Sequence, residues 1–252
     1  MKFAIFPQNV SLAGKSIYSN FVNLVSELDE IVPQSLEADA AIIWSVLWSG
    51  RMAPNKDIYY HYRKQNKPVI ILETGNLIRN QTYKLCINNI NALGQHALDL
   101  DLDRTAILNT FTPIVPSTDN ILVCCQNEKS LLWAGMATSH VWVKSVVQNL
   151  PREKITIRLH PRFRTIVDLP GYNIIKPNYT SEDDTDFREV VKNFGTVINY
   201  NSGSGIEAKM LGLNVRADKS SLANLSPDLI ARTEWFESEI PRVWQHLRAK
   251  LC

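Results

Sequence analysis

The sequence predicts an α/β protein with two domains, each built on a parallel sheet that helices cover on both faces. Short runs of apolar residues, typical of buried strands, alternate with segments whose apolar residues recur at helical spacing. This alternation is interrupted near Pro113 and Pro116 and then begins again. With 252 residues, of which 45% are hydrophobic and 21% charged, the chain is long and apolar enough to form a core in each half.

The first predicted domain covers residues 1–115. Its strands are apolar runs that stop at polar or turn-forming residues, and its helices have apolar residues three or four positions apart. The segment from Gln95 to Phe111 has little pattern, so the boundary is placed after it. In chain order the expected elements are strand Phe3–Phe6, helix Ser16–Leu28, strand Ala40–Trp44, helix Asp57–Gln65 and strand Val69–Leu72.

The second predicted domain, residues 116–252, repeats this rhythm. Its expected strands are Asn120–Cys125, Lys154–Leu159, Tyr172–Lys176, Thr196–Tyr200 and Asn214–Ala217. Its expected helices are His140–Leu150, Asp184–Asn193, Ile206–Leu211 and two more at the end of the chain. We therefore expect two Rossmann-like domains facing each other across a cleft, with ligands beyond the carboxyl ends of the strands.

Composition sets limits on partners and location. A net charge of +2 neither requires nor excludes a nucleic-acid partner. The four cysteines show no metal-binding spacing, and the adjacent Cys124 and Cys125 lie in an apolar run, so buried thiols in a reducing compartment are expected. The start of the chain is unlike a signal peptide and no apolar stretch is long enough to span a membrane, which predicts a soluble, cytoplasmic protein.

The clearest candidate for a binding site is the segment from Asn199 to Ala208. A predicted strand runs into Ser202, Gly203, Ser204 and Gly205 and then directly into a helix. Small residues and free N–H groups at a helix N-terminus suit a phosphate, although neither the P-loop nor the GxGxxG pattern is present. Glu207, expected in the first helical turn, is a candidate ribose ligand. The alternative is a tight turn in which Glu207 caps the helix.

A basic cluster follows another predicted strand. Arg158, His160, Arg162 and Arg164 gather around Pro161, and guanidinium groups match the geometry of phosphate. Together these side chains form a candidate anion site. The alternative is a solvated basic loop whose histidine is satisfied by the backbone.

Glu73 ends the most apolar strand of the first half. A carboxylate there could act as general base toward an acceptor hydroxyl, although an ordinary turn with a partly exposed glutamate is the alternative. Aromatic and basic side chains elsewhere in this half are candidate acceptor contacts, because they can stack on a ring or bind phosphate, and otherwise would be core or helix surface. These candidates are Trp48, Arg51, Tyr59, Arg63 and Arg79.

Taken in order, these motifs resemble a group of glycosyltransferases with the GT-B fold. The likeness is to capsule-polysaccharide transferases that handle 3-deoxy-manno-octulosonate and to phage-type transferases that glycosylate hydroxymethylated bases of DNA. One departure is Thr74, because the capsule enzymes tend to have Asp after the glutamate. The segments that carry the resemblance are Trp44 with Gly50-Arg51, Lys67 to Gly75, Gln126, His160-Pro161-Arg162 and Ser202 to Leu211.

The resemblance implies a nucleotide-sugar donor, with a UDP-sugar as the first choice, and no tightly bound cofactor. Gln126, His160, Arg162, the Ser202–Gly205 segment and Glu207 would bind this donor, and Glu73 would face the acceptor. No convincing acidic motif for a metal–diphosphate complex ends a strand, so transfer is expected to be metal-independent. The expected acceptor is a 5-hydroxymethylpyrimidine of DNA, with a capsular or surface glycan as the alternative. A non-catalytic nucleotide- or nucleic-acid-binding module and an epimerase-like enzyme are the competing functions.

Overall fold

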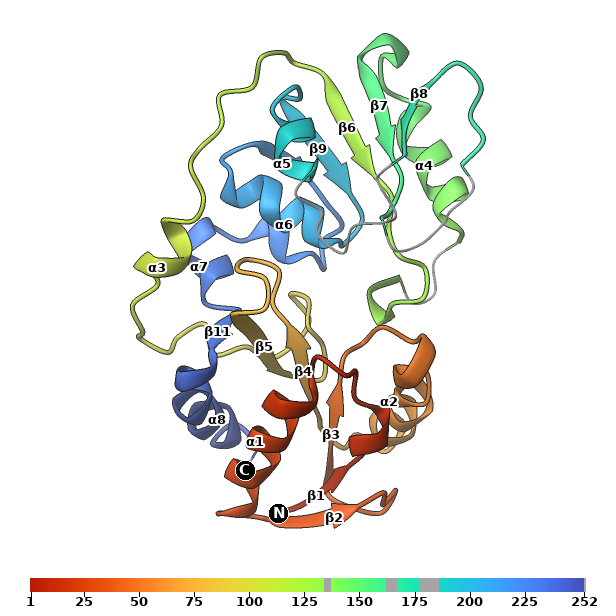
Figure 1. Ribbon diagram of the computed structural model, residues 1–252. Coiled ribbons are helices and arrows are strands. Elements are labelled where there is room, and N and C mark those ends of the chain that lie inside the picture. Colours follow the sequence, from red (N-terminus) through yellow and green to blue (C-terminus); the bar gives the residue numbers. More distant parts are fainter. Residues whose placement is uncertain (134–136, 162–166, 177–185, 252) are drawn as a thin grey trace. The chain divides into compact units, whose positions relative to one another are not determined.

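The computed structural model of the chain describes residues 1–133, 137–161, 167–176 and 186–251. It consists of two compact units with one sheet each (Figure 1). Unit 1 comprises Met1–Ile107 and Ala231–Cys252, and unit 2 comprises Leu108–Ile230. The predicted α/β class with two Rossmann-like units is confirmed.

Unit 1 contains a six-stranded sheet with the order β11-β5-β4-β3-β1-β2. The strands β1 to β4 are parallel, whereas β5 runs antiparallel to β4 and β11 antiparallel to β5. The strands are β1 (Lys2–Ile5), β2 (Glu30–Pro33), β3 (Ala40–Trp44), β4 (Val69–Thr74), β5 (Thr82–Ile87) and β11 (Trp235–Phe236). The helices are α1 (Lys15–Ser26), α2 (Asn55–Lys64), α8 (Ile240–Arg248) and the short α3 (Thr105–Leu108), which leads into unit 2.

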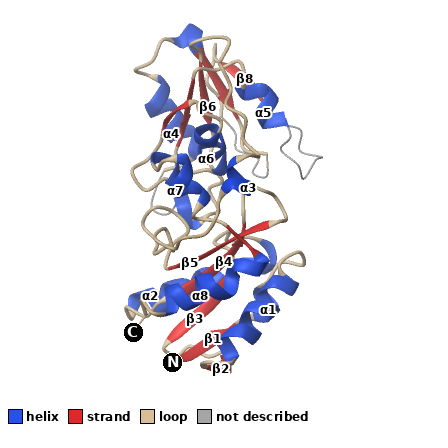
Figure 2. Cartoon of the chain, turned by 90° about the vertical axis from the view of Figure 1, so that its left-hand side faces the viewer, coloured by secondary structure: helices blue, strands red, loops and turns tan. Residues whose placement is uncertain are grey.

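Alternating strand residues bury the two faces of this sheet. Phe3, Ile42 and Leu72 belong to the core that α1 and α8 complete with Phe21 and Trp244. Figure 2 shows these two helices side by side across the strands. The helix α2 packs on β3 and β4 and covers the opposite face. The side chains of alternate strand residues therefore point to opposite layers of helices, as expected for a doubly wound sheet.

Unit 2 contains a five-stranded parallel sheet with the order β10-β9-β6-β7-β8. The buried Cys124 and Cys125 at the end of β6 form no disulfide, in line with the expected buried thiols. The strands are β6 (Ile121–Cys124), β7 (Ile155–Arg158), β8 (Asn173–Ile175), β9 (Thr196–Asn199) and β10 (Asn214–Arg216). The helices are α4 (Ser139–Val147), α5 (Asp186–Val191), α6 (Gly203–Met210) and α7 (Pro227–Ala231), whose last residue already belongs to unit 1.

Each sheet has a point where the chain reverses the direction in which it adds strands. In unit 1, β1 lies between β2 and β3, and in unit 2, β6 lies between β7 and β9. Ligands of open α/β sheets bind beyond the carboxyl ends of the strands at such a point. The ends of β6 and β9 are therefore the first place to look for a ligand site in unit 2.

The division of the chain differs from the predicted 1–115 and 116–252. The boundary lies between Ile107 and Leu108, and Ala231–Cys252 returns to unit 1. The physical reason is the apolar face of α8, which buries Trp244 and Leu247 completely in the core of unit 1. Within the described ranges, no helix is both long and apolar enough to cross a bilayer.

Candidate functional site

The N-terminus of α6 lies at the switch point of unit 2. The helix begins at Gly203, three residues earlier than predicted, with Ser202 as its N-cap residue. The Ser202 hydroxyl does not cap the helix but lies 2.5 Å from the Ser204 hydroxyl. Among the described residues, the N–H groups of Gly203 and Ser204 therefore have no hydrogen-bond acceptor. Uncapped N–H groups at a helix N-terminus attract anions.

One further donor, in the side chain of Asn199, lies beneath this helix end. Asn199, only 1% exposed, accepts a hydrogen bond from the Ser202 N–H through Oδ1 at 3.1 Å. Its Nδ2 is buried and has no partner within the described part of the chain. A buried donor without an acceptor is costly, and an acceptor oxygen supplied by a ligand would remove that cost.

Gly205 has a role that the sequence did not predict. We expected its missing side chain to admit a ligand, but a Cβ atom here would lie 1.9 Å from Asn199 Nδ2. Gly205 is therefore needed so that the Asn199 amide fits under α6. The glycine therefore shapes this helix N-terminus through its close approach to Asn199.

Gln126 joins the ends of β6 and β9. Its side chain is 3% exposed, accepts a hydrogen bond from the Asn201 N–H at 3.2 Å and donates one to the Asn201 carbonyl at 3.4 Å. Asn201 in turn donates through Nδ2 to Ser220 Oγ at 2.9 Å, and Ser220 Oγ donates to Asp218 Oδ1 at 2.6 Å. This buried network, Gln126–Asn201–Ser220–Asp218, fixes the loop that leads into α6. Gln126, predicted as a donor contact, binds the backbone of that loop.

Glu207 is the fifth residue of α6, so its predicted place in the first helical turn is wrong, because the helix begins at Gly203. Its carboxylate accepts a hydrogen bond from Arg188 Nε at 2.7 Å in a partly exposed ion pair. Arg188 also lies over the Phe111 ring, 4.9 Å from its centroid. A ribose at Glu207 would therefore share this carboxylate with Arg188.

The basic cluster is only partly described. Arg162 and Arg164 lie outside the described residues, and His160 is half-buried just beyond the end of β7. Arg158 is 2% exposed, and its guanidinium lies 5.5 Å from the centroid of the Phe187 ring. Because Arg158 is packed in the interior, it does not belong to an exposed basic loop.

Glu73 lies near the carboxyl end of β4 in unit 1, directly opposite Lys84 of β5. Burial raises the pKa of Glu73, while the Ser45 hydroxyl, the Thr74 N–H and the Lys84 charge act to lower it. The Thr74 N–H donates to Glu73 Oε1 at 3.0 Å. Ser45, at the end of β3, has a left-handed backbone with φ of 66°, and its N–H donates to the Leu72 carbonyl at 2.7 Å.

Glu234 is a site residue that the sequence did not reveal. Its fully buried carboxylate accepts hydrogen bonds from the Asn76 and Leu77 N–H groups and from Thr82 Oγ1, and lies 3.7 Å from Lys84 Nζ. A Cβ atom on Gly75 would lie 2.3 Å from Glu234 Oε2, so the turn after β4 requires glycine. Glu234 holds this turn from a segment that was predicted to belong to the other domain.

The candidate acceptor contacts are only partly brought together. The Trp48 and Tyr59 rings lie 5.9 Å apart, and the Tyr59 hydroxyl donates to the Asn88 carbonyl at 2.8 Å. Arg63 donates to the Lys67 carbonyl at 3.0 Å, which ties down the end of α2. Arg51 is exposed in the short 3₁₀ turn Gly50–Met52, and Arg79 is half-buried in the turn after β4. Of the five, Arg51 is therefore exposed, Tyr59 is buried, and Trp48, Arg63 and Arg79 are half-buried.

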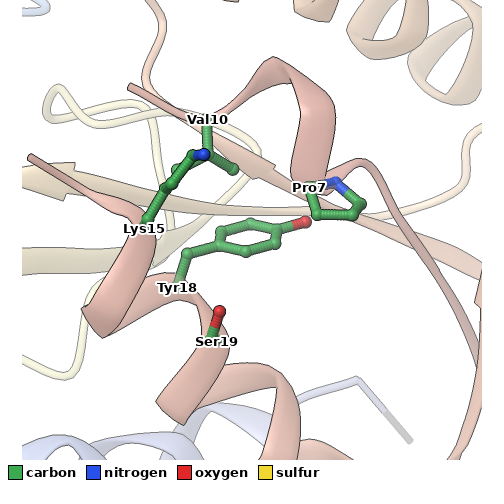
Figure 3. Close-up of a pocket in the computed structure, with 5 residues that line it drawn as sticks. All are labelled: Pro7, Val10, Lys15, Tyr18 and Ser19. Carbon is green, nitrogen blue, oxygen red and sulfur yellow. The ribbon is translucent and has the colours of Figure 1, made fainter. Parts of the chain in front are cut away.

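Unit 1 also has a pocket of about 190 Å³ beside its own switch point (Figure 3). Pro7 and Val10 follow β1, and Lys15, Tyr18 and Ser19 of α1 complete the lining. The Tyr18 hydroxyl accepts from the Phe6 N–H and donates to the Ile42 carbonyl, so this side chain ties α1 to β1 and β3. No residue that the sequence singled out as a site residue lines this pocket.

Comparison with known proteins identifies the fold. No protein-family model and no curated protein sequence matches the chain. It is similar to two solved structures of KpsC from Thermosulfurimonas dismutans. The β-Kdo 2,4-transferase has 14% identity and a TM-score of 0.51, with 92% of this chain and 90% of that one covered. The β-Kdo 2,7-transferase has 15% identity and a TM-score of 0.53, with 99% of each chain covered. At this identity the likeness shows the fold alone, and that fold is the GT-B type with two Rossmann-like units.

Proposed function

We propose that this chain transfers a sugar from a nucleotide-sugar donor to a hydroxyl acceptor. The observation that carries the proposal is the set of donors without acceptors at the switch point of unit 2. The N–H groups of Gly203 and Ser204 and the buried Nδ2 of Asn199 lie at one helix N-terminus, and the Gln126–Asn201–Ser220–Asp218 network fixes the adjoining loop. An anion such as a phosphate fits this arrangement.

In the proposed reaction, the acceptor oxygen forms a bond to the anomeric carbon while the bond from that carbon to the phosphate oxygen breaks. Negative charge then grows on the departing nucleotide. The N-terminus of α6, with the hydroxyls of Ser202 and Ser204, would stabilise this charge, helped by His160 and Arg162. Glu207 is the proposed ribose ligand. The transfer needs no metal ion in this scheme, and a UDP-sugar is the first donor to try.

Glu73 is the proposed general base that takes the proton from the acceptor hydroxyl. Burial raises its pKa above the ordinary value of a carboxylic acid, which makes it a stronger base toward the acceptor proton. The Lys84 charge opposes this shift and favours the ionised form. A non-catalytic binding module would have no use for such a carboxylate.

Two acceptors are considered. The two similar structures are those of β-Kdo transferases, which supports a sugar hydroxyl as acceptor. A 5-hydroxymethylpyrimidine of DNA is the second candidate, and the half-buried Trp48 ring, close in the sequence to the exposed Arg51, favours it, because a base can stack on such a ring.

The test is a transfer assay with purified full-length protein. A panel of nucleotide sugars is incubated with glycan acceptors or with DNA containing 5-hydroxymethylcytosine or 5-hydroxymethyluracil, and the products are read by mass spectrometry. We expect one acceptor to gain the mass of one sugar residue, and Glu73→Gln to abolish this gain while donor binding remains. Glu27→Gln, at an exposed glutamate that ends α1, is the matched control. Donor consumption without any acceptor would instead indicate an epimerase or hydrolase.

A further inference from the structure

Unit 2 has a pocket of about 320 Å³ whose lining includes Asn199 and Asp218, and its other lining residues have no role in the arrangement described above. Trp142 and Val146 of α4 form one side, and the end of β9, residues 198–200, forms another. The end of β10 and the residues after it, 216–218, close the third side. The pocket therefore lies at the carboxyl ends of two strands, where ligands of parallel sheets bind.

Aromatic rings form one corner of this pocket. The Tyr200 and Trp142 rings meet edge to face, with centroids 6.2 Å apart and planes at 77°. Trp133, only 4% exposed, contacts both, at 5.0 Å from Tyr200 and 6.1 Å from Trp142. Because the buried Trp133 ring contacts both of the other rings, it restrains their orientation. A rigid aromatic corner suits a flat ring as ligand.

Opposite charges line the other side. The Asp218 carboxylate is fixed through Oδ1, which accepts hydrogen bonds from the Ser220 N–H at 2.9 Å and from Ser220 Oγ at 2.6 Å. Arg216 is exposed and forms no ion pair with any described residue. The pocket lining therefore contains a hydrogen-bond acceptor, the Asp218 carboxylate, and a donor, the Arg216 guanidinium. The edge of a nucleobase presents donors next to acceptors and is complementary to such a pair.

The pocket and the N-terminus of α6 share one loop. Tyr200 lines the pocket, and its carbonyl accepts a hydrogen bond from the Asp218 N–H at 3.0 Å. Asn201 and Ser220 connect Asp218 to Gln126. The next residue, Ser202, is the N-cap of α6. A nucleotide with its base in the pocket would thus have its phosphate close to the uncapped helix end.

We propose that this pocket binds a nucleobase, which stacks in the corner of Tyr200 and Trp142 and meets Asp218 and Arg216 along its edge. This inference rests on the proposed function in one respect, because it assumes that the ligand at the N-terminus of α6 is the phosphate of a nucleotide. The base comes from the donor nucleotide or from an unpaired base of a nucleic acid, and the recognition chemistry is the same.

The experiment compares ligands with and without a base. Ribose 5-phosphate, CMP, UMP, AMP and GMP are titrated into the full-length protein by calorimetry. We expect at least one nucleotide to bind about 10-fold more tightly than ribose 5-phosphate, the gain typical of stacking one base on an aromatic residue. Tyr200→Ala and Trp142→Ala should remove this gain, whereas Tyr200→Phe keeps the ring and should retain it. Asp218→Asn should change the order of preference among the bases, because an amide also donates.

Asp119→Asn, at an exposed aspartate of the same unit, is the control and should change neither affinity nor order. A second arm titrates a short single-stranded oligonucleotide. If Tyr200→Ala weakens the binding of the oligonucleotide but not that of the nucleotides, the base belongs to a nucleic acid. The proposal is overturned if no ligand with a base exceeds ribose 5-phosphate, or if the gain survives in folded Tyr200→Ala. Base-dependent binding without sugar transfer would refute the proposed function alone, and transfer with unaltered base affinity in Tyr200→Ala would refute the pocket alone.

Discussion

Glu73 and Lys84 are direct cross-strand partners on the antiparallel strands β4 and β5, and Lys84 also lies 3.7 Å from the buried carboxylate of Glu234. The buried ammonium group of Lys84 therefore forms an ion pair with Glu234 and also acts electrostatically on Glu73. Burial raises the pKa of Glu73 and the Lys84 charge partly offsets this effect. The ionisation state of the proposed base thus depends on a residue that the sequence did not single out.

Replacing Lys84 should move the pH dependence of the proposed transfer. In Lys84→Met the pKa of Glu73 rises further, because the charge that favours its ionised form is gone. A base must be deprotonated to act, so activity is lost as the pH falls through this pKa, and the acidic limb of the kcat/KM profile should shift to higher pH. Lys56→Met, at an exposed lysine of α2, is the control. An acidic limb that does not move in folded Lys84→Met would contradict Glu73 as the base.

Gly205→Ala should destabilise the protein through Asn199. A methyl group would lie 1.9 Å from Asn199 Nδ2, and overpacking of this kind costs about 1–3 kcal/mol. Chemical denaturation of the two single variants and the double variant Gly205→Ala/Asn199→Ala measures the coupling between these residues. We expect the double variant to regain part of the loss, since the shortened side chain leaves room for the methyl group. Purely additive effects would mean that Gly205 is needed for another reason.

Gln126→Ala should weaken anion binding at α6 without removing any of its N–H donors. The two hydrogen bonds to the Asn201 backbone would be lost, so the loop before the helix would have to be ordered by the ligand itself. We expect the affinity for inorganic pyrophosphate, measured by calorimetry, to fall about 10-fold, equivalent to about 1.4 kcal/mol. Gln148→Ala, at an exposed residue that ends α4, should bind as the parent chain does. Unchanged affinity in Gln126→Ala would separate this network from the anion site.

Asp29 should make stability sensitive to acid. Hydrogen bonds from Arg248 hold its pKa below the ordinary value, and the N-terminal ammonium group acts in the same direction. A carboxylate with a lowered pKa stabilises the fold above the pKa of the unfolded chain, about 3.9, and this contribution is lost as the pH falls through the folded pKa. In Asp29→Asn, unfolding by urea should show a loss of about 3 kcal/mol at pH 7. The difference from the parent chain should shrink toward pH 3, whereas Asp57→Asn, at an exposed position, should differ little at any pH.

Most of the parallel strands could be predicted from the sequence because they are buried on both faces. Ala40–Trp44 is observed with the predicted ends, and Val69–Leu72 extends by two residues to Thr74. The edge strand β2, the antiparallel β5 and the two-residue β11 were missed. The strand β5 contains Thr82 and Lys84 within its buried run, and these residues are paired with Glu234 from far along the chain. Burial of a polar residue with a distant partner leaves no local pattern to recognise.

In the candidate site, too, contacts between residues distant in the sequence could not be predicted. The strand-to-helix turn at Ser202–Gly205 was recognisable, because small residues after an apolar strand are a local pattern. The Gln126 contact with Asn201 and the place of Glu207 depend on where α6 begins and on which residues lie across the sheet. Glu234 could not be assigned at all, since its role depends on the return of Ala231–Cys252 to unit 1. A local motif thus indicates a candidate ligand site, whereas the supporting contacts are set by the topology.

The return of Ala231–Cys252 to unit 1 also determines the order in which the two units are completed during synthesis. All of unit 2, Leu108–Ile230, emerges from the ribosome before β11 and α8 do. Trp235 and Trp244, both fully buried, fill the core of unit 1 from these last elements. Unit 2 therefore has its complete sequence available for folding while unit 1, which begins the chain, still exposes part of its apolar core. Unit 1 is thus completed after unit 2, although most of its residues precede unit 2 in the chain.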